Sequence, residues 1–452
     1  MEDTPTSDSP EIKLSDGLDA SNSDVDLEVF EKGTETFSSK IRFWLNSFFQ
    51  PNFTLSLLSI TFVIERSGLA PSSLFIFYAF VAHYFLEYFV TKLLKSRKHD
   101  YLLEFFTAEE LPPIFPKLYA FFVHVYHICL NVYILLLLND VLYQPFQAIS
   151  PNFLLKYKKA ISIIVFSFFN LISLGRDFPK SLILVSFIAC STIFYLACHS
   201  FYRSIVTQEG SNRSLQIDSM NENVLSLFCF CLFSFGFPPI LNKNLIPINN
   251  PENDEQEMSV LDNNETINGA LNPKLIDETK ENKQIEKKKK RCQNFGNNLL
   301  VFLKLLVLAT VGITIYAAYG RYINTTQFFS FSMNNTIANI CRVSYFLVFL
   351  LSSVNSNFKL NVKSDYSTIL SKLVISVLLS LLVEASLPFA VLCGVVNSFI
   401  IEILLLGIAS LIQRQNLSLN TIILTSVFIL MAGIIGSFVI YNSIFDIILY
   451  YK

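Results

Sequence analysis

The sequence predicts an all-α membrane protein, a polytopic bundle of about 10–11 transmembrane helices. Of its 452 residues, 52% are hydrophobic and only 15% are charged, against about 25% charged residues in soluble domains. Several windows of about 20 residues are almost wholly apolar, which is the length that a helix needs to cross a bilayer core. These apolar runs are long and continuous, whereas a β-barrel would show short alternating segments.

Residues 1–40 are predicted to be a disordered acidic tail on the cytosolic side of the membrane. The first 38 residues hold eleven Asp and Glu but only two Lys. Low hydrophobicity combined with a high net charge is typical of disorder. The tail has no apolar segment like that of a cleaved signal peptide, so we expect the first span to direct insertion.

The N-terminal membrane half, residues 41–241, contains six candidate spans. They lie at about 44–64, 73–94, 115–138, 159–175, 181–202 and 223–241. The first is interrupted by Asn46, Gln50, Pro51 and Asn52, so an interfacial or re-entrant segment is an alternative. The sixth ends in GFPPIL at 236–241, where two prolines are expected to stop the helix.

A polar segment, residues 242–297, separates the two membrane halves. It is rich in Asn, Asp and Glu, as disordered linkers are, and it is predicted to be cytosolic. Its basic run is either a topology signal or a contact for anionic lipid head groups, which attract each basic residue by about 1 kcal/mol. The run consists of Lys287, Lys288, Lys289, Lys290 and Arg291.

The C-terminal membrane half, residues 298–452, contains five further candidate spans. They lie at about 298–319, 338–355, 367–387, 389–412 and 420–441, and the third and fourth meet around Pro388. Five spans on each side of a linker would suit an inverted repeat. The intramembrane polar residues of the two halves do not recur at matching positions, however, so the residues themselves show no repeat.

Basic residues in the short loops predict the orientation of the chain. With the N-terminus in the cytosol, the basic segments at 92–98, 175–180 and 359–363 also lie there, and only KYKK at 156–159 is an exception. The sequons at Asn212 and Asn324 then face the lumen and are candidate glycosylation sites. We therefore expect a eukaryotic endomembrane location, in the endoplasmic reticulum or another compartment.

Ionisable side chains inside the apolar runs are the main candidates for a functional site. FVAHYFLEYFV at 80–90 has a histidine and a glutamate four residues apart, and FFVHVYHICLN at 121–131 adds two histidines and an asparagine. Residues three or four apart share one face of a helix. A further glutamate lies deep in the tenth span. We predict one intramembrane polar cluster formed by His83, Glu87, His124, His127, Asn131 and Glu402.

Such a cluster has three interpretations. An ionisable group in lipid costs at least about 2.5 kcal/mol, so these side chains should face one another. Imidazoles and carboxylates together suit a proton relay or a zinc or iron site. They also suit a hydrogen-bonded network that only holds helices together. Charged residues nearer the ends of spans are expected to extend toward the membrane surface: Lys304, Arg342, Lys372 and Glu384.

Three classes of function follow. A non-catalytic membrane component that organises lipids or partner proteins is favoured by the presence of only 14 glycines and by the lack of Walker, GxSxG and HExxH patterns. The alternatives are a proton- or cation-coupled transporter that uses the cluster, and a lipid-modifying enzyme. The cysteine spacing matches no zinc pattern, so no metal site is assigned, and the sequence identifies no cofactor or catalytic residue. The expected partners are the lipid bilayer, anionic lipids and other membrane proteins, and not nucleic acid.

Overall fold

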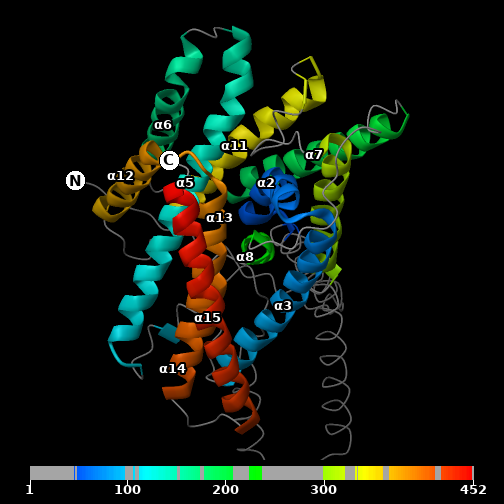
Figure 1. Cartoon of the computed structure of the whole chain (residues 1–452). Coiled ribbons are helices and arrows are strands. Elements are labelled where there is room, and N and C mark those ends of the chain that lie inside the picture. Colours follow the sequence, from blue (N-terminus) through cyan, green and yellow to red (C-terminus); the bar gives the residue numbers. More distant parts are fainter. Residues whose placement is uncertain are drawn as a thin grey trace, which may run out of the picture. The chain divides into compact units, whose positions relative to one another are not determined.

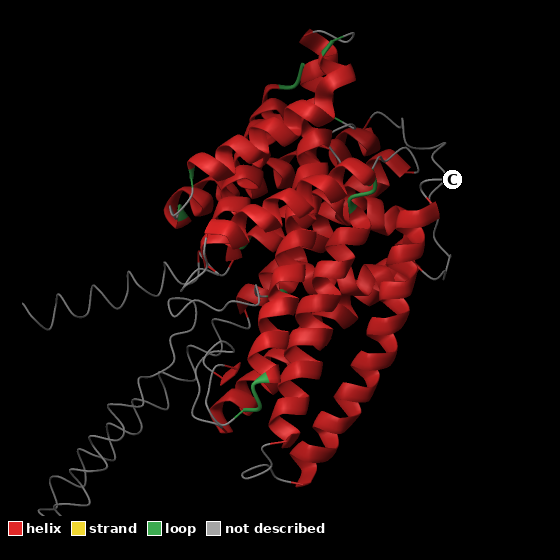
Figure 2. Cartoon of the chain, turned by 90° about the vertical axis from the view of Figure 1, so that its left-hand side faces the viewer, coloured by secondary structure: helices red, strands yellow, loops and turns green. Residues whose placement is uncertain are grey.

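The computed structural model describes residues 45, 48–96, 105–106, 111–149, 153–173, 178–206, 223–236, 299–320, 331–332, 334–359, 366–412 and 419–449. In this part of the chain the regular elements are helices and there is no strand, which confirms the predicted all-α class (Figures 1 and 2). The chain divides into two units, Met1–Trp44 and Leu45–Lys452, and all these residues belong to the second. The predicted tail at 1–40, the linker at 242–297 with its basic run, and both sequons lie outside the described residues.

Seven helices in the described ranges are long and apolar enough to cross a membrane, and the chain is accordingly a multi-pass membrane protein. One of the seven is a continuous run of three elements, α13 (Leu387–Gly394), η3 (Val395–Leu405) and α14 (Leu406–Ile412). The other six are α3 (Leu69–Ser96), α5 (Ile114–Ile149), α7 (Pro179–Val206), the helix Leu299–Tyr319, α11 (Thr336–Lys359) and α15 (Leu419–Leu449).

Four more helices coincide with the remaining predicted spans. They are α2 (Pro51–Ser67), α6 (Leu154–Ile172), α8 (Asn223–Phe235) and α12 (Tyr366–Leu382). Helices α2 and α12 have 17 residues each and α8 has 13, which is short for a bilayer core. Helix α6 carries three lysines in its first two turns. That all four cross the membrane stays a prediction.

Helix α2 is surrounded by other helices. Its neighbours include α8, α3 and α7, and 13 of its 17 residues are buried. Two of its polar side chains bond to tyrosines of α5: Asn52 Nδ2 donates to the Tyr126 hydroxyl at 2.8 Å, and the hydroxyls of Ser59 and Tyr133 lie 3.0 Å apart. Gln50 and Asn52, two of the polar residues that interrupt this span in the sequence, are thus buried within the protein. Whether α2 spans the membrane or is an interfacial or re-entrant segment stays a prediction.

Helix α8 is the element against which α2, α3 and α13 pack (Figure 1). The closest approach is at Gly394, the last residue of α13, where an added Cβ would lie 2.1 Å from the backbone oxygen of Cys229 in α8. Only glycine permits backbones to come so near. The contact positions the start of η3 beside the C-terminal end of α8.

Lys159 has a structural role that accounts for part of KYKK, the one basic segment that does not fit the predicted orientation. Lys159, on α6, donates from Nζ to the carbonyl oxygens of Leu381 (3.1 Å) and Val383 (3.3 Å), where α12 ends. A cation at a helix C-terminus satisfies carbonyls that have no partner within the helix and opposes their negative dipole. The position of this lysine therefore has a cause other than membrane orientation.

Candidate functional site

A buried lysine lies at the centre of the polar side chains in the bundle. Lys304, on the helix Leu299–Tyr319, is 1% exposed. Its Nζ donates to Gln50 Oε1 at 3.2 Å and lies 5.7 Å from the ring centroid of Phe53, within the range of a cation–π contact. Gln50 precedes α2 and is itself buried. Lys304 thus connects its own helix to the start of α2.

Helix α3 brings an imidazole and a carboxylate to the same lysine. His83 is 4% exposed and Glu87 is half-buried. Both lie within electrostatic range of Lys304, so the glutamate attracts the lysine and a charged imidazole would repel it. The His83 ring also lies against Phe235, with the two ring centroids 6.2 Å apart. His83 and Glu87, four residues apart, therefore lie on the side of α3 that faces Lys304.

The second carboxylate of the site lies on an unusual helix. Element η3 is a π-helix of 11 residues, in which each turn holds more residues than in an α-helix. Residues five apart then share a face, and Asn397 Nδ2 donates to Glu402 Oε1 at 3.2 Å across that interval. The Asn397 amide also lies 3.4 Å from the Cβ position of Gly236, at the end of α8. The π-helix therefore aims both side chains at the same region.

Glu402 joins the groups on α3 to those on α5. It lies within electrostatic range of Glu87 and of the tyrosines Tyr119 and Tyr126. Element η3 packs on both helices, whereas α3 packs chiefly on α8, and α5 on α6, α11, α12 and α13. The direct pairing of α3 with α5, expected from their order in the chain, is therefore not the main contact of either helix. A connection brings helix ends together and does not oblige their faces to meet.

The residues of α5 that were predicted to join the polar cluster lie in different environments. His127 is buried, and its Nδ1 lies 2.7 Å from the carbonyl oxygen of Val123 in the same helix. His124 is half-buried and lies within electrostatic range of Lys372 on α12. Asn131 is fully buried, and neither atom of its amide has a hydrogen-bond partner among the described residues. These groups border the site and do not surround His83.

Three cations that the sequence places near the ends of spans are buried. Lys304, Arg342 and Lys372 are each no more than 3% exposed, so the expectation that they extend to the membrane surface is wrong. Glu384, the fourth, is exposed. Lys304 lies on a helical stripe with Leu308 and other inner residues, and the opposite stripe, which includes Phe302, faces outward. Because both stripes are apolar, the sequence does not show which one is inside.

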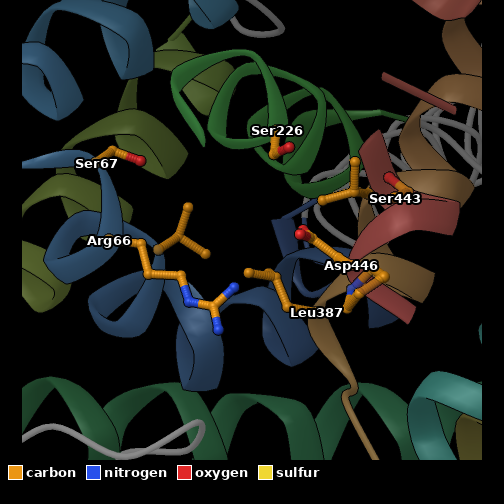
Figure 3. A pocket seen from close by; sticks show the side chains of 9 residues that line it. Arg66, Ser67, Ser226, Leu387, Ser443 and Asp446 are labelled. Carbon is orange, nitrogen blue, oxygen red and sulfur yellow. The ribbon is translucent and has the colours of Figure 1, made fainter. Parts of the chain in front are cut away.

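A small pocket lies where the ends of four other helical elements meet (Figure 3). It is a cavity of about 10 Å³, room for about one water molecule, between the C-terminal ends of α2 and α15 and the N-terminal ends of α8 and α13. Arg66 and Asp446 both point into the space (Figure 3). Its lining residues are Val63, Arg66, Ser67, Ser226, Leu387, Pro388, Val391, Ser443 and Asp446.

Comparison with profiles of known protein families gave no match, and comparison with curated proteins gave none either. Within the described residues, no three His, Cys, Asp or Glu side chains are placed to hold a metal ion. The chemistry of the site depends on its own groups. These are two carboxylates, a lysine and an imidazole, carried by three helices and enclosed by aromatic rings.

Proposed function

We propose that this multi-pass membrane protein is a proton-coupled carrier and that its proton site is the cluster of His83, Glu87, Lys304 and Glu402. One observation carries the proposal: α3, the helix Leu299–Tyr319 and η3 each contribute an ionisable side chain to one buried region. Groups of this kind are costly within a membrane and mark ion or proton pathways there. A network that served only to hold helices together needs hydrogen bonds and does not need charges.

The arrangement suits a change of protonation. Glu87 lies within range of one cation, Lys304, and of one carboxylate, Glu402. The Glu87 and Glu402 carboxylates repel each other when both are ionised, so a proton on one of them relieves the repulsion. Protonation and deprotonation of Glu402 would then change the attraction between η3 and α3. A carrier requires such a link between proton binding and helix packing.

The π-helix η3 is an element whose winding can respond to a change in the protonation of Glu402. Its hydrogen bonding differs from that of α13 and α14 on either side, and π-segments within α-helices are frequent at functional sites. Discontinuous helices near the middle of a membrane also form the sites of many secondary transporters. Element η3 packs on α15, α5, α3 and α8, and its first residue, Val395, lies beside Gly436 of α15. A change in its winding would therefore reach several helices.

The substitution Glu402→Gln tests the proposal because the new side chain keeps an acceptor for the Asn397 amide but cannot ionise. Purified protein would be reconstituted into vesicles with an imposed pH gradient, and solute-induced currents would be recorded across a panel of small solutes. We expect the full-length chain to give a pH-driven current with at least one solute class. We expect Glu402→Gln to reduce that current at least tenfold while the melting temperature changes little.

The matched control is Glu384→Gln, the same chemical change at an exposed carboxylate before α13. It should leave the current unchanged. Equal currents in the wild type and Glu402→Gln would contradict the proposal. A large fall in melting temperature, with no current from the wild type, would instead favour the non-catalytic component, in which the cluster only holds the bundle together.

The compartment and the lipid contacts are part of the same proposal. The sequons at Asn212 and Asn324 and the basic loops support an endomembrane location, in the endoplasmic reticulum or a neighbouring compartment. The basic run 287–291 supports contact with anionic lipid head groups. Both rest on the sequence alone.

A further inference from the structure

A buried lysine on α12 has no partner for its charge. Lys372 is 2% exposed, and its Nζ has neither a hydrogen bond nor an ion pair within the described residues. Burying an ammonium group is costly unless a counter-charge or hydrogen bonds replace the lost water. Lys304 meets this requirement through Gln50 and Glu87. The group that Lys372 lacks is an anion.

A second basic side chain lies next to this lysine. His124, on α5, is within electrostatic range of Lys372, and its Nδ1 is buried with no hydrogen-bond partner in the part of the chain that the structure describes. The residue as a whole is only half-buried, so the pair is reached from the outer surface of the bundle at this ring. A charged imidazole and the ammonium group repel each other, whereas one anion between them attracts both.

The pair lies toward the starts of α5 and α12, which are on the same side of the bundle. Lys159, near the start of α6, binds the carbonyl oxygen of Leu381 at the end of α12, and α6 begins soon after α5 ends. Helix α12 therefore runs parallel to α5. At 1.5 Å per residue, Lys372 is about 9 Å from the start of α12 and His124 about 15 Å from the start of α5.

The surface around the pair is apolar and faces outward. Helix α12 lies beside α5 and packs more lightly on α6 (Figure 1). On α5, Phe121 is one turn before His124 and is exposed. Lys117, also exposed, is one turn earlier on the same stripe. The outer face of α12 consists of exposed aliphatic side chains, which are Leu370, Val374, Ile375, Leu378, Leu381 and Leu382.

We propose that Lys372 and His124 hold a phosphate oxyanion at the seam between α5 and α12. The ammonium group offers three N–H donors and the imidazole at least one, and the phosphate oxygens accept from both. Two sources offer this chemistry. One is the head group of an acidic phospholipid, whose acyl chains would lie along the apolar outer faces of the two helices. The other is inorganic phosphate.

The position of the seam supports the lipid as a source. Basic sites between membrane helices bind anionic head groups on the cytosolic side. The basic loops place the starts of α5 and α12 on that side. The exposed Lys117 adds a cation between the seam and the start of α5. The proposal thus concerns a site separate from the basic run 287–291.

Admission of the anion requires a movement of one side chain and no enclosed cavity. The Lys372 Nζ is covered, so it must turn toward the His124 ring to meet a ligand at the surface. Its four-carbon stem is long and flexible, and lysines near helix ends extend in this way toward head groups. The turn breaks no hydrogen bond of the ammonium group to any described residue.

The test measures binding to the purified full-length chain in a neutral detergent by titration calorimetry. Dihexanoyl phosphatidic acid represents the lipid, and sodium phosphate represents the free anion. Dihexanoyl phosphatidylcholine is the control, because it has the same chains and no net charge. We expect phosphatidic acid or sodium phosphate to bind about tenfold more tightly than phosphatidylcholine.

Substitutions assign the binding to the seam. Lys372→Met and His124→Leu should each weaken the binding of the phosphate ligand by about tenfold, because each removes a charge-assisted hydrogen bond. Lys180→Met, the same change at an exposed lysine of α7, should leave it unchanged. If Lys372→Met does not accumulate, His124→Leu and the wild type still decide the question.

Melting temperatures distinguish an anion site from a structural lysine. Without added phosphate ligand, Lys372→Met should keep or raise the melting temperature, because it removes a buried charge that has no partner. The phosphate ligand should raise the melting temperature of the wild type and not that of Lys372→Met. A large fall in the melting temperature of Lys372→Met without ligand would overturn the inference, since the lysine would then have a partner in the protein.

The two ligands identify the source of the phosphate. Tighter binding of phosphatidic acid than of sodium phosphate assigns the site to a lipid head group, and the reverse assigns it to a soluble anion. Binding of neither, or binding that survives both seam substitutions, would contradict the proposal. The inference does not depend on the proton-coupled carrier, because α5 and α12 contribute no member of the proton cluster. Glu402→Gln should therefore bind the phosphate ligand as the wild type does, whatever its proton-driven current.

Discussion

Lys304 shows how one side chain connects local sequence to the packing of the bundle. Its neighbours along the chain, VFLKLLVLA, are almost all apolar, so no local partner for the ammonium group exists on its own helix. The partners come from distant segments: Gln50 before α2, and His83 and Glu87 on α3. Sequence periodicity describes one helix at a time, so it does not reveal a long-range charge pair of this kind.

The substitution Lys304→Met should destabilise the protein by about 1–3 kcal/mol, because it leaves the side-chain amide oxygen of Gln50 buried without its partner and removes the cation that attracts Glu87. Adding Glu87→Leu should recover part of the loss, since a buried pair is replaced more easily as a pair than singly. Thermal unfolding of the purified variants, followed by a thiol-reactive dye, measures both. Lys180→Met, at an exposed lysine of α7, is the control. A double variant less stable than Lys304→Met would show that the two side chains act separately.

At the scale of whole elements, the sequence predicts most of the helices but does not predict which neighbours surround each of them. The eleven apolar segments all coincide with helices or continuous helical runs. Length and composition suffice for that, because a run of apolar residues forms a helix in lipid whatever lies next to it. The π-winding of η3 and the burial of most of α2 depend on neighbours that are distant in the chain. No pattern within VVNSFIIEILL or NFTLSLLSITF shows them.

The contact between α8 and α13 is the element-scale feature most open to test. Gly394→Ala would place a methyl group 2.1 Å from the Cys229 backbone oxygen, so the two helices must separate. Overpacking of this kind costs about 1–3 kcal/mol, and the displacement should also disturb η3 directly after it. Gly433→Ala on α15 is the matched control, because nothing lies within 4 Å of its Cβ position. There alanine should be neutral or stabilise the helix by up to about 1 kcal/mol.

Melting temperatures of the two alanine variants give the comparison directly. Equal changes in melting temperature would contradict the close approach of α8 and α13 at Gly394. The same pair separates function from folding: Gly394→Ala should lower the proton-driven current more than Gly433→Ala, because only the first lies at the start of the π-helix.

At the scale of the molecule, the sequence predicts which kinds of residue form the candidate site. It does not predict which of these residues lie together. The sequence selects His83, Glu87 and Glu402 because buried charge in an apolar run is unusual. It groups them with His124 and His127 by order along the chain, whereas the structure groups them with Lys304 through packing. The pocket of Arg66 and Asp446 is beyond sequence reasoning, because its residues come from four helix ends and lie up to 383 positions apart, from Val63 to Asp446.

The arrangement of the helix ends also predicts how the chain crosses the membrane. Helix α8 begins at the pocket and leads away from it, whereas α15 ends there. A tag inserted at 242–297, after α8, and a tag at the C-terminus should therefore lie on opposite sides of the membrane. The basic loops place 242–297 in the cytosol, together with the N-terminus. Protease added to sealed microsomes should remove the N-terminal and 242–297 tags and spare the C-terminal tag until detergent is added.

Each outcome of that experiment has a distinct structural meaning. Protection of the 242–297 tag with loss of the C-terminal tag would keep the bundle and reverse its orientation. Equal treatment of the two tags would mean that α8, with only 13 residues, does not separate the two sides. Glycan on Asn324 gives an independent check, because the helix Leu299–Tyr319 starts on the cytosolic side in this orientation and its far end faces the lumen. Asn324→Gln should then migrate faster than the wild type, and glycosidase should remove the difference.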